Sequence, residues 1–142
     1  MSSEANKDVV RGWVNEVLNG HDIAAIETYY ASNCVHHDVE MGDGYGLVAE
    51  KQVTTTFISG FPDLRCTIKT IFAEGDQVAA LSTFSGTHSG DLMGLPPTGK
   101  QFEASIMLIF QLADGKIVEH WSNGNIMSQL NKLGIIPQPA TA

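Results

Sequence analysis

The sequence has 142 residues, of which 43% are hydrophobic and 17% charged, and this fits one globular domain. Its 16 acidic and 8 basic residues give a formal net charge of −8. That argues against nucleic-acid and anionic-membrane partners, because phosphate binding needs a basic face. No apolar run approaches the roughly 20 residues of a membrane span and no signal peptide is recognisable, so we expect a cytoplasmic protein. Cys34 and Cys66 lack zinc-site spacing and are expected to be reduced and buried.

The first half of the chain predicts helices. Apolar residues recur at three- and four-residue spacing in the first segment, and Gly20 follows as a terminator. Asp22 is the expected cap of a second helix. Helices are expected over residues 9–18, 23–30 and 47–59, with an extended segment over 33–40 and a glycine-rich loop over 41–46.

The second half changes to the two-residue alternation of β-strands. Asp114-Gly115 is the clearest hairpin turn, and the stretch 89–99, rich in glycine and proline, predicts a long connection. Strands are expected over residues 64–73, 77–88, 100–112 and 116–122, then a short helix over 125–133 and a flexible tail over 136–142.

This order predicts one α+β domain over residues 1–142, with helices on the concave side of a curved, mainly antiparallel sheet that encloses a pocket. The other sheet face mixes apolar and polar side chains, which suits burial against a second copy. We therefore expect a homodimer through the face that carries Glu103, Ser105, Met107, Ile109, Glu119 and Trp121.

Several segments, in order along nearly the whole chain, resemble the SnoaL-like polyketide cyclases. The most specific are Gly94-Leu95-Pro96-Pro97-Thr98-Gly99 and Asp114-Gly115-Lys116-Ile117-Val118-Glu119-His120-Trp121. The others are Asn19-Gly20-His21-Asp22, Val35-His36-His37-Asp38, Phe61-Pro62-Asp63-Leu64, Gly86-Thr87-His88-Ser89-Gly90 and Gln129-Leu130.

The resemblance implies a cone-shaped fold similar to nuclear transport factor 2, scytalone dehydratase and ketosteroid isomerase. It also implies an enzyme that closes a ring in a polyketide ester by intramolecular aldol condensation, without a metal or an organic cofactor. In these cyclases the general acid/base is an aspartate on the last strand, just after the Glu-His-Trp segment, helped by histidines on the same face.

The sequence departs from this pattern at the catalytic positions. Ser122 follows Trp121, and Asn125 stands where relatives often carry another acid. Leu108 fills the expected place of a helper histidine. A serine cannot replace a carboxylate as a general base at neutral pH, so the family mechanism does not carry over unchanged.

The candidate acid/base residues are Asp38, His37 and His120. Asp38 follows a short strand, as the proton-shuttling aspartate of ketosteroid isomerases does, but it could instead accept backbone N–H groups in the following turn. Because His36 and His37 alternate along a strand, only one of them can face the pocket, and the family pattern favours His37. His120 is in phase with Ser122 on the last strand, and could equally be a hydrogen-bonded core residue.

The remaining pocket candidates are aromatic or apolar side chains on the predicted concave surface. His88 is the exception, since a structural role at the start of the 89–99 connection is the better interpretation for it. The expected substrate-binding residues are Trp13, Tyr29, Phe57, His88, Ile106, Leu108, Phe110 and Ser122. No group has recognisable metal-ligand spacing, so neither a metal nor an organic cofactor is expected.

Two functions of different classes remain open. The first is a cofactor-independent cyclase, lyase or isomerase acting on a small apolar or aromatic carbonyl compound. The second is a dimeric ligand-binding module that kept the pocket and lost the chemistry, which the missing strand acid favours. Epoxide hydrolysis on the same scaffold needs an arginine between two carboxylates, and Arg11 and Arg65 are poorly placed for that.

Overall fold

The computed structural model describes residues 2–137, and its helices lie at both ends of the chain and between strands β2 and β3. Ser2 caps the first helix by accepting the N–H of Ala5, and Asp22 accepts the N–H of Ala25, as its cap position predicts. The helices are α1 (Ser3–Trp13), which continues as a π-helical segment η1 (Val14–Asn19), then the 3-10 turn η2 (Ile23–Ala25), α2 (Ile26–Tyr29), α3 (Gly46–Gly60) and α4 (Ile126–Lys132).

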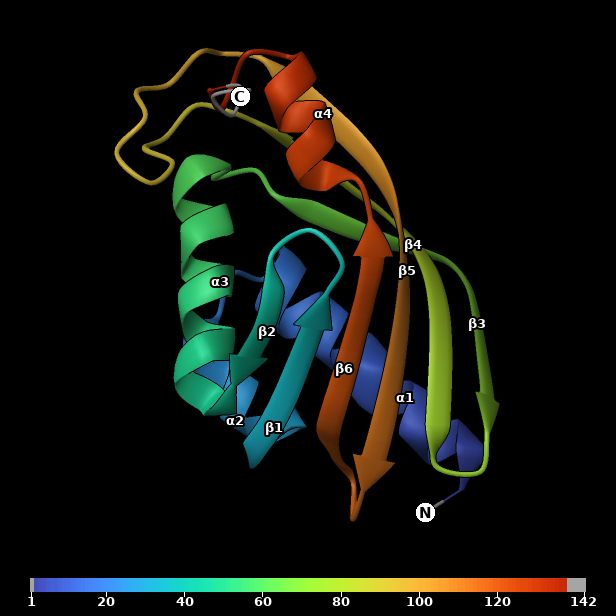
Figure 1. Cartoon of the computed structure of the whole chain (residues 1–142). Helices are drawn as coiled ribbons and strands as arrows, with labels where there is room; N and C mark the ends of the chain where they lie inside the picture. The colour runs from blue at the N-terminus through green and yellow to red at the C-terminus, as the bar shows by residue number, and fades with distance from the viewer. Residues whose placement is uncertain (1, 138–142) are drawn as a thin grey trace.

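Six strands form one curved sheet in the order β2-β1-β6-β5-β4-β3 (Figure 1). All neighbouring pairs are antiparallel except β1 and β6, which run parallel. The strands are β1 (Tyr30–Asp38), β2 (Gly42–Tyr45), β3 (Arg65–Glu74), β4 (Gln77–Thr87), β5 (Gln101–Ala113) and β6 (Lys116–Gly124).

The core lies between the concave face of the sheet and the helices. In Figure 1, α1 crosses behind the sheet, α3 stands beside β1 and β2, and α4 lies over one end of β5 and β6. Alternate residues of β5 are buried, as its sequence predicts, and Phe110 is fully buried. Asp114 and Gly115 both have positive φ in the turn from β5 to β6, which is the geometry that an Asp-Gly hairpin favours.

Several predicted boundaries differ from the structure. The second helix breaks into η2 and α2, and the extended segment starts at Tyr30, three residues earlier than expected. Residues 42–45 form strand β2, which was predicted to be a loop, because their backbone pairs with β1. The predicted tail begins too early: Ile136 is only 8% exposed and belongs to the core. Residues 138–142 of that tail lie outside the described residues.

Over residues 2–137, no helix combines the length and the apolar character that crossing a membrane requires.

Candidate active site

A cavity of about 90 Å³ lies between the concave face of the sheet and helices α1, α3 and α4. Most of its wall is apolar, which suits a ligand that is itself largely apolar. The apolar and aromatic lining residues are Trp13, Leu18, Met41, Val53, Phe57, Leu64, Phe84, Ile106, Leu108, Ile126 and Met127.

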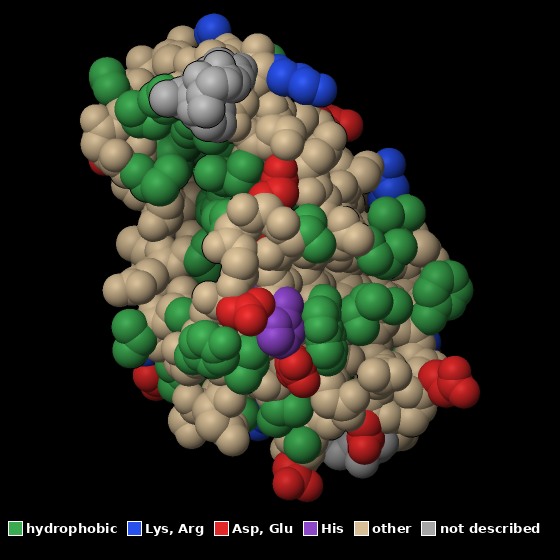
Figure 2. Space-filling view, in the orientation of Figure 1, with side chains coloured by type: hydrophobic (Ala, Val, Ile, Leu, Met, Phe, Trp, Pro, Cys, Tyr) green, Lys and Arg blue, Asp and Glu red, His purple; other side chains and the backbone are tan. Residues whose placement is uncertain are grey.

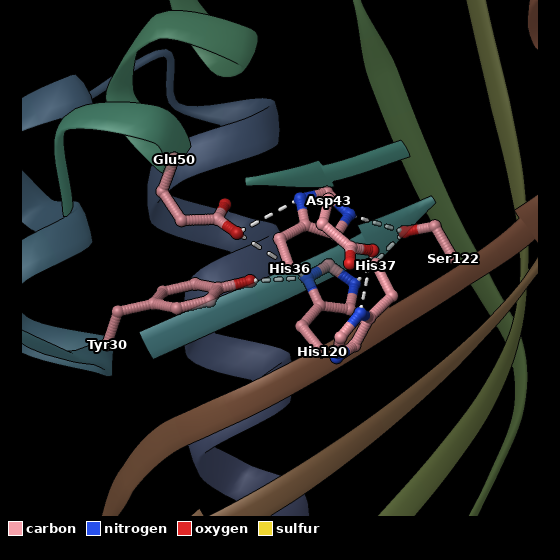
Figure 3. Close-up of polar contacts among 7 residues, drawn as sticks. All are labelled: Tyr30, His36, His37, Asp43, Glu50, His120 and Ser122. Carbon is pink, nitrogen blue, oxygen red and sulfur yellow. Dashed lines mark hydrogen bonds and ion pairs between the residues drawn. The ribbon is translucent and has the colours of Figure 1, made fainter. Parts of the chain in front are cut away.

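One wall of this cavity carries a polar cluster, which we define as Tyr30, His36, Glu50, His120 and Ser122 (Figure 3). The parallel pairing of β1 with β6 places His36 beside His120 and Asp38 beside Ser122. The two imidazole rings therefore stack, with centroids 4.4 Å apart and planes 5° apart. Glu50 reaches the same point from α3, as Figure 3 shows.

The hydrogen bonds in the polar cluster form a series in which each group donates to the next, from Tyr30 through His120 and Ser122 to His36. The Tyr30 hydroxyl lies 2.8 Å from His120 Nδ1, and Ser122 Oγ lies 3.3 Å from His120 Nε2 and 3.0 Å from His36 Nε2. Among the described residues, the Tyr30 hydroxyl has no acceptor other than His120 Nδ1, so its O–H donates to this nitrogen. This leaves the imidazole proton of His120 on Nε2, from which it donates to Ser122. The Ser122 O–H then donates to His36 Nε2, which leaves the proton of a neutral His36 on Nδ1, facing Glu50.

Burial keeps two members of this series uncharged. Desolvation, with a smaller contribution from the charge of Glu50, raises the pKa of Tyr30 well above its ordinary value. Desolvation also lowers the pKa of His120 well below its ordinary value, with further contributions from His36 and His37. Tyr30 therefore stays a phenol, and His120 stays a neutral imidazole with a single N–H.

Glu50 is a buried carboxyl group, only 2% exposed, that nonetheless lines the cavity. Its Oε1 lies 3.0 Å from His36 Nδ1 and 4.0 Å from His120 Nδ1. The contact with His36 is bent away from hydrogen-bond alignment, and in the described part of the chain no donor is aligned with this oxygen. Since buried carboxylates are ordinarily paired with donors, Glu50 has spare capacity to accept a proton or a hydrogen bond.

A sequence model of the family described as SnoaL-like polyketide cyclase matches residues 8–133. The chain belongs to this family.

Other similarities agree with this assignment. The SnoaL-like chain is 33% identical over 60 residues to nogalonic acid methyl ester cyclase from Streptomyces nogalater, a match that spans 42% of this chain and 45% of that enzyme. AclR from Streptomyces galilaeus, a proposed hydroxylase, superposes with a TM-score of 0.82 at 28% identity, over 99% of this chain and 87% of its own. IdmH from Streptomyces antibioticus, a proposed polyketide cyclase, superposes with a TM-score of 0.75 at 31% identity, over 91% of this chain and 98% of its own. These similarities confirm the expected fold.

Two of the three residues predicted to act in acid/base catalysis lie differently from expectation in this SnoaL-like domain. His37 was expected to face the pocket and does not: it points to the opposite face of the sheet, where it contacts Asp43 and Glu119 and stacks on Trp121. Asp38 contributes to the cavity rim, but its Oδ1 accepts the N–H groups of Glu40 and Met41, at 2.8 and 2.9 Å. These bonds match the turn-forming alternative.

His120 does lie in the cavity wall, together with most of the predicted binding residues. Phe110 is one step removed, because it packs beneath the His120 ring with centroids 4.5 Å apart. Besides Phe110, two predicted binding residues are not among the lining residues: Tyr29, which packs against Gly12, and His88, which accepts the N–H of Thr98 and holds the connection to β5. Of the predicted binding residues, the cavity is lined by Trp13, Phe57, Ile106, Leu108 and Ser122.

Sequence reasoning missed Tyr30, His36 and Glu50. A usable signal existed for Glu50, because Glu50, Val53, Thr54 and Phe57 follow the i, i+3, i+4, i+7 spacing of one helix face, and all four line the cavity. Tyr30 and His36 carry no comparable local signal. The pairing of β1 with β6 decides which way they face.

His36, Glu50 and His120 also bring two nitrogens and a carboxylate oxygen within 4.8 Å of one another, as metal ligands would. A metal lies in the plane of each imidazole that binds it, along the nitrogen lone pair. The His36 and His120 rings are stacked 4.4 Å apart and are only 5° from parallel, so one ion cannot lie in the planes of both rings. The cluster as it stands therefore suits proton transfer better than metal coordination.

Proposed function

We propose that this protein catalyses an aldol-type ring closure of a small apolar carbonyl compound, with Glu50 as the general base. The observation that carries the proposal is the buried Glu50 carboxyl, which lines the cavity and has no aligned hydrogen-bond donor within residues 2–137. In the SnoaL-like cyclases the catalytic carboxylate lies on the last strand, where this chain has Ser122. Glu50 supplies a carboxylate to the pocket from helix α3 instead. The name of the Streptomyces nogalater relative points to a polyketide methyl ester as the substrate class.

The proton path follows from the polar cluster. Glu50 takes a proton from the carbon next to a substrate carbonyl, which leaves an enolate. The enolate carbon forms the new carbon–carbon bond with a second carbonyl of the same molecule, and the resulting alkoxide takes the proton back. His36 Nδ1, 3.0 Å from Glu50, stabilises the carboxylate before the proton is taken and after it is returned.

Neutral N–H donors are available for the enolate oxygen. Trp13 lines the cavity, and its buried indole N–H has no acceptor among the described residues. A donor that is already desolvated gains more from a developing negative charge than a donor in water does. We assign Trp13 the role of binding the carbonyl that becomes the enolate.

Glu50 is a better candidate base than Asp38. Oδ1 of Asp38 already accepts the backbone N–H groups of Glu40 and Met41, so these hydrogen bonds hold the carboxyl group in the turn. The alternative of a non-catalytic binding module drew its support from the missing strand acid. A carboxyl group at position 50 weakens that support.

The test measures exchange of carbon-bound hydrogen in heavy water, which needs a base and no specific substrate. With 2-tetralone as an apolar ketone probe, nuclear magnetic resonance should show exchange faster with the protein than in buffer. Glu50→Gln should lower the protein-catalysed rate by about 10²–10⁴, because it keeps the shape and removes the base. Asp38→Asn is the matched control and should stay within a few-fold of the wild type.

If Glu50→Gln folds normally and exchanges at the wild-type rate, the proposal fails. If Asp38→Asn abolishes exchange instead, Asp38 is the base. Ring closure of nogalonic acid methyl ester, followed by mass spectrometry and chromatography, then tests the substrate class.

A further inference from the structure

The same wall of the cavity holds a hydroxyl, an imidazole and a carboxyl group in sequence. Ser122 Oγ lies 3.0 Å from His36 Nε2, and His36 Nδ1 lies 3.0 Å from Glu50 Oε1 (Figure 3). Ser122, His36 and Glu50 all line the cavity, and Glu50 is only 2% exposed. This is the order of groups that activates a serine: the imidazole takes the hydroxyl proton, and the carboxylate holds the tautomer and stabilises the imidazolium.

The direction of the hydrogen bonds matches that use. Because His120 Nε2–H donates to Ser122 Oγ, the hydroxyl proton is directed to His36 Nε2. His36 is thus engaged by the Ser122 hydroxyl in the resting state and is positioned to take its proton. The bent contact between His36 and Glu50 is of the kind that tightens once a substrate charges the imidazole.

Two N–H groups of the cavity wall are available to stabilise an oxyanion. The first is His120 Nε2–H, 3.3 Å from the serine oxygen. Its charge state is suitable, because burial lowers the pKa of His120 and keeps this ring neutral with its proton on Nε2. The second is the indole N–H of Trp13, whose ring lies edge-on to His120 with centroids 5.4 Å apart and which is buried without an acceptor in residues 2–137.

We propose that Ser122 is the nucleophile of a Ser122–His36–Glu50 triad that hydrolyses small apolar esters in this cavity. This activity is separate from ring closure, because it breaks a carbon–oxygen bond and forms no carbon–carbon bond. The Ser122 oxygen adds to the ester carbonyl while its proton moves to His36 Nε2. The carbonyl oxygen, now negative, accepts hydrogen bonds from His120 and Trp13.

The remaining steps balance with water alone. The tetrahedral adduct collapses, the alcohol leaves with the proton from His36, and an acyl group stays on Ser122. Water then attacks this ester while His36 takes its proton, and the carboxylic acid and the free serine are released. Glu50 stays an acceptor throughout and acts by orienting and stabilising His36.

The test uses p-nitrophenyl butyrate, an apolar ester whose product is coloured. The wild-type protein should release p-nitrophenolate above the buffer rate, and Ser122→Ala should lower the protein-catalysed rate by about 10²–10⁴. The matched control is Ser105→Ala, an exposed serine on β5, which should leave the rate unchanged. Hydrolysis should also be insensitive to a chelator. Loss of the rate with chelator would assign the reaction to a metal and overturn the proposal.

A second measurement removes the dependence on variant folding. Incubation of the wild-type protein with a fluorophosphonate should stop ester hydrolysis and add one phosphonyl group to the peptide that contains Ser122, as detected by mass spectrometry. No hydrolysis above the Ser122→Ala background, or labelling only at another residue, would overturn the proposal. Hydrogen exchange of 2-tetralone by the wild type without phosphonyl labelling of Ser122 would support the Glu50 base alone, and labelling without exchange would support the triad alone, so the two proposals fail separately.

Discussion

At the scale of single residues, adjacent histidines on one strand have opposite environments. His36 faces the cavity, whereas His37 lies between Asp43 on β2 and Glu119 on β6, at 2.8 and 2.6 Å. The hydrogen bond to Asp43, followed by that to Glu119, raises the pKa of His37 above its ordinary value of 6.5. The two carboxylates therefore favour the protonated form of His37, whereas burial favours the neutral form of His120.

We predict a pH-dependent contribution of His37 to stability. Because the folded pKa is above the unfolded one, the contribution is complete below about 6.5 and disappears as the pH rises through the folded pKa. The difference in unfolding free energy between the wild type and His37→Gln should thus be larger at pH 6 than at pH 8.5. Urea denaturation at several pH values measures it.

The difference in unfolding free energy between the wild type and His37→Gln separates the contribution of His37 from that of His120. The lowered pKa of His120 makes stability depend on pH in the opposite direction. His120 favours folding above pH 6.5 and loses that contribution as the pH falls. It faces His36 and Tyr30 on β1 and Glu50 on α3, which His37→Gln leaves in place. A difference that is constant with pH, or larger at pH 8.5, would contradict the prediction for His37.

At the scale of elements, α4 is held over the cavity by a side chain from another element. The N-cap residue Asn125 makes no capping hydrogen bond. Instead, the carboxylate of Glu40, in the turn between β1 and β2, accepts the N–H groups of Met127 and Ser128 and the Ser128 hydroxyl, at 2.8 to 3.1 Å. Because Met127 lines the cavity, this contact couples the turn to one wall of the site.

We predict that Glu40→Ala loosens α4 selectively. Loss of a capping carboxylate costs about 1 kcal/mol, and here the cost falls on one short helix. Amide hydrogen exchange, read by mass spectrometry, should accelerate in residues 126–132 and stay unchanged in β4 and β5. Glu103→Ala, an exposed acid on β5, is the matched control. Equal exchange in the two variants would show that the Glu40 contacts do not hold the helix.

At the scale of the whole molecule, the sheet face opposite the helices carries exposed apolar side chains. Figure 2 shows hydrophobic side chains gathered on this face, with acidic side chains and a histidine among them. Met107 and Ile109 on β5 are 41% and 39% exposed, and Trp121 on β6 lies beside them, paired with Ile109. Such a strip is costly to leave in water and suits burial against a matching strip.

We propose a two-fold dimer through this face, as the alternation of β5 and β6 predicts. Sedimentation velocity at micromolar concentration should give the mass of two chains. Ile109→Glu should shift the protein to monomer, because it places a charge in the middle of the buried strip. Val48→Glu, at an exposed position on helix α3 and therefore away from this sheet face, is the control and should leave the dimer intact. A wild-type monomer at these concentrations would contradict the proposal.

Much of the fold follows from local patterns in the sequence. Alternation along 100–112 and 116–122, with Asp114-Gly115 between them, predicts the β5–β6 hairpin, because period and turn chemistry act over a few residues. Strand β2 is the counterexample. Its four residues have little strand propensity, and they become a strand only by hydrogen bonding to β1.

By itself, therefore, the sequence determined the α+β class, the family, the apolar lining of the pocket and the opposite orientation of His36 and His37. Only the tertiary structure decided which of the two faces the cavity, because strand alternation defines two faces without saying which one the helices cover. It also decided that Glu50 lies beside His36 in the cavity wall and that His36 meets Ser122, which is 86 positions away in the sequence. Periodicity and turn signals act over a few residues, whereas this meeting depends on the parallel pairing of β1 with β6 and the packing of α3 against β1.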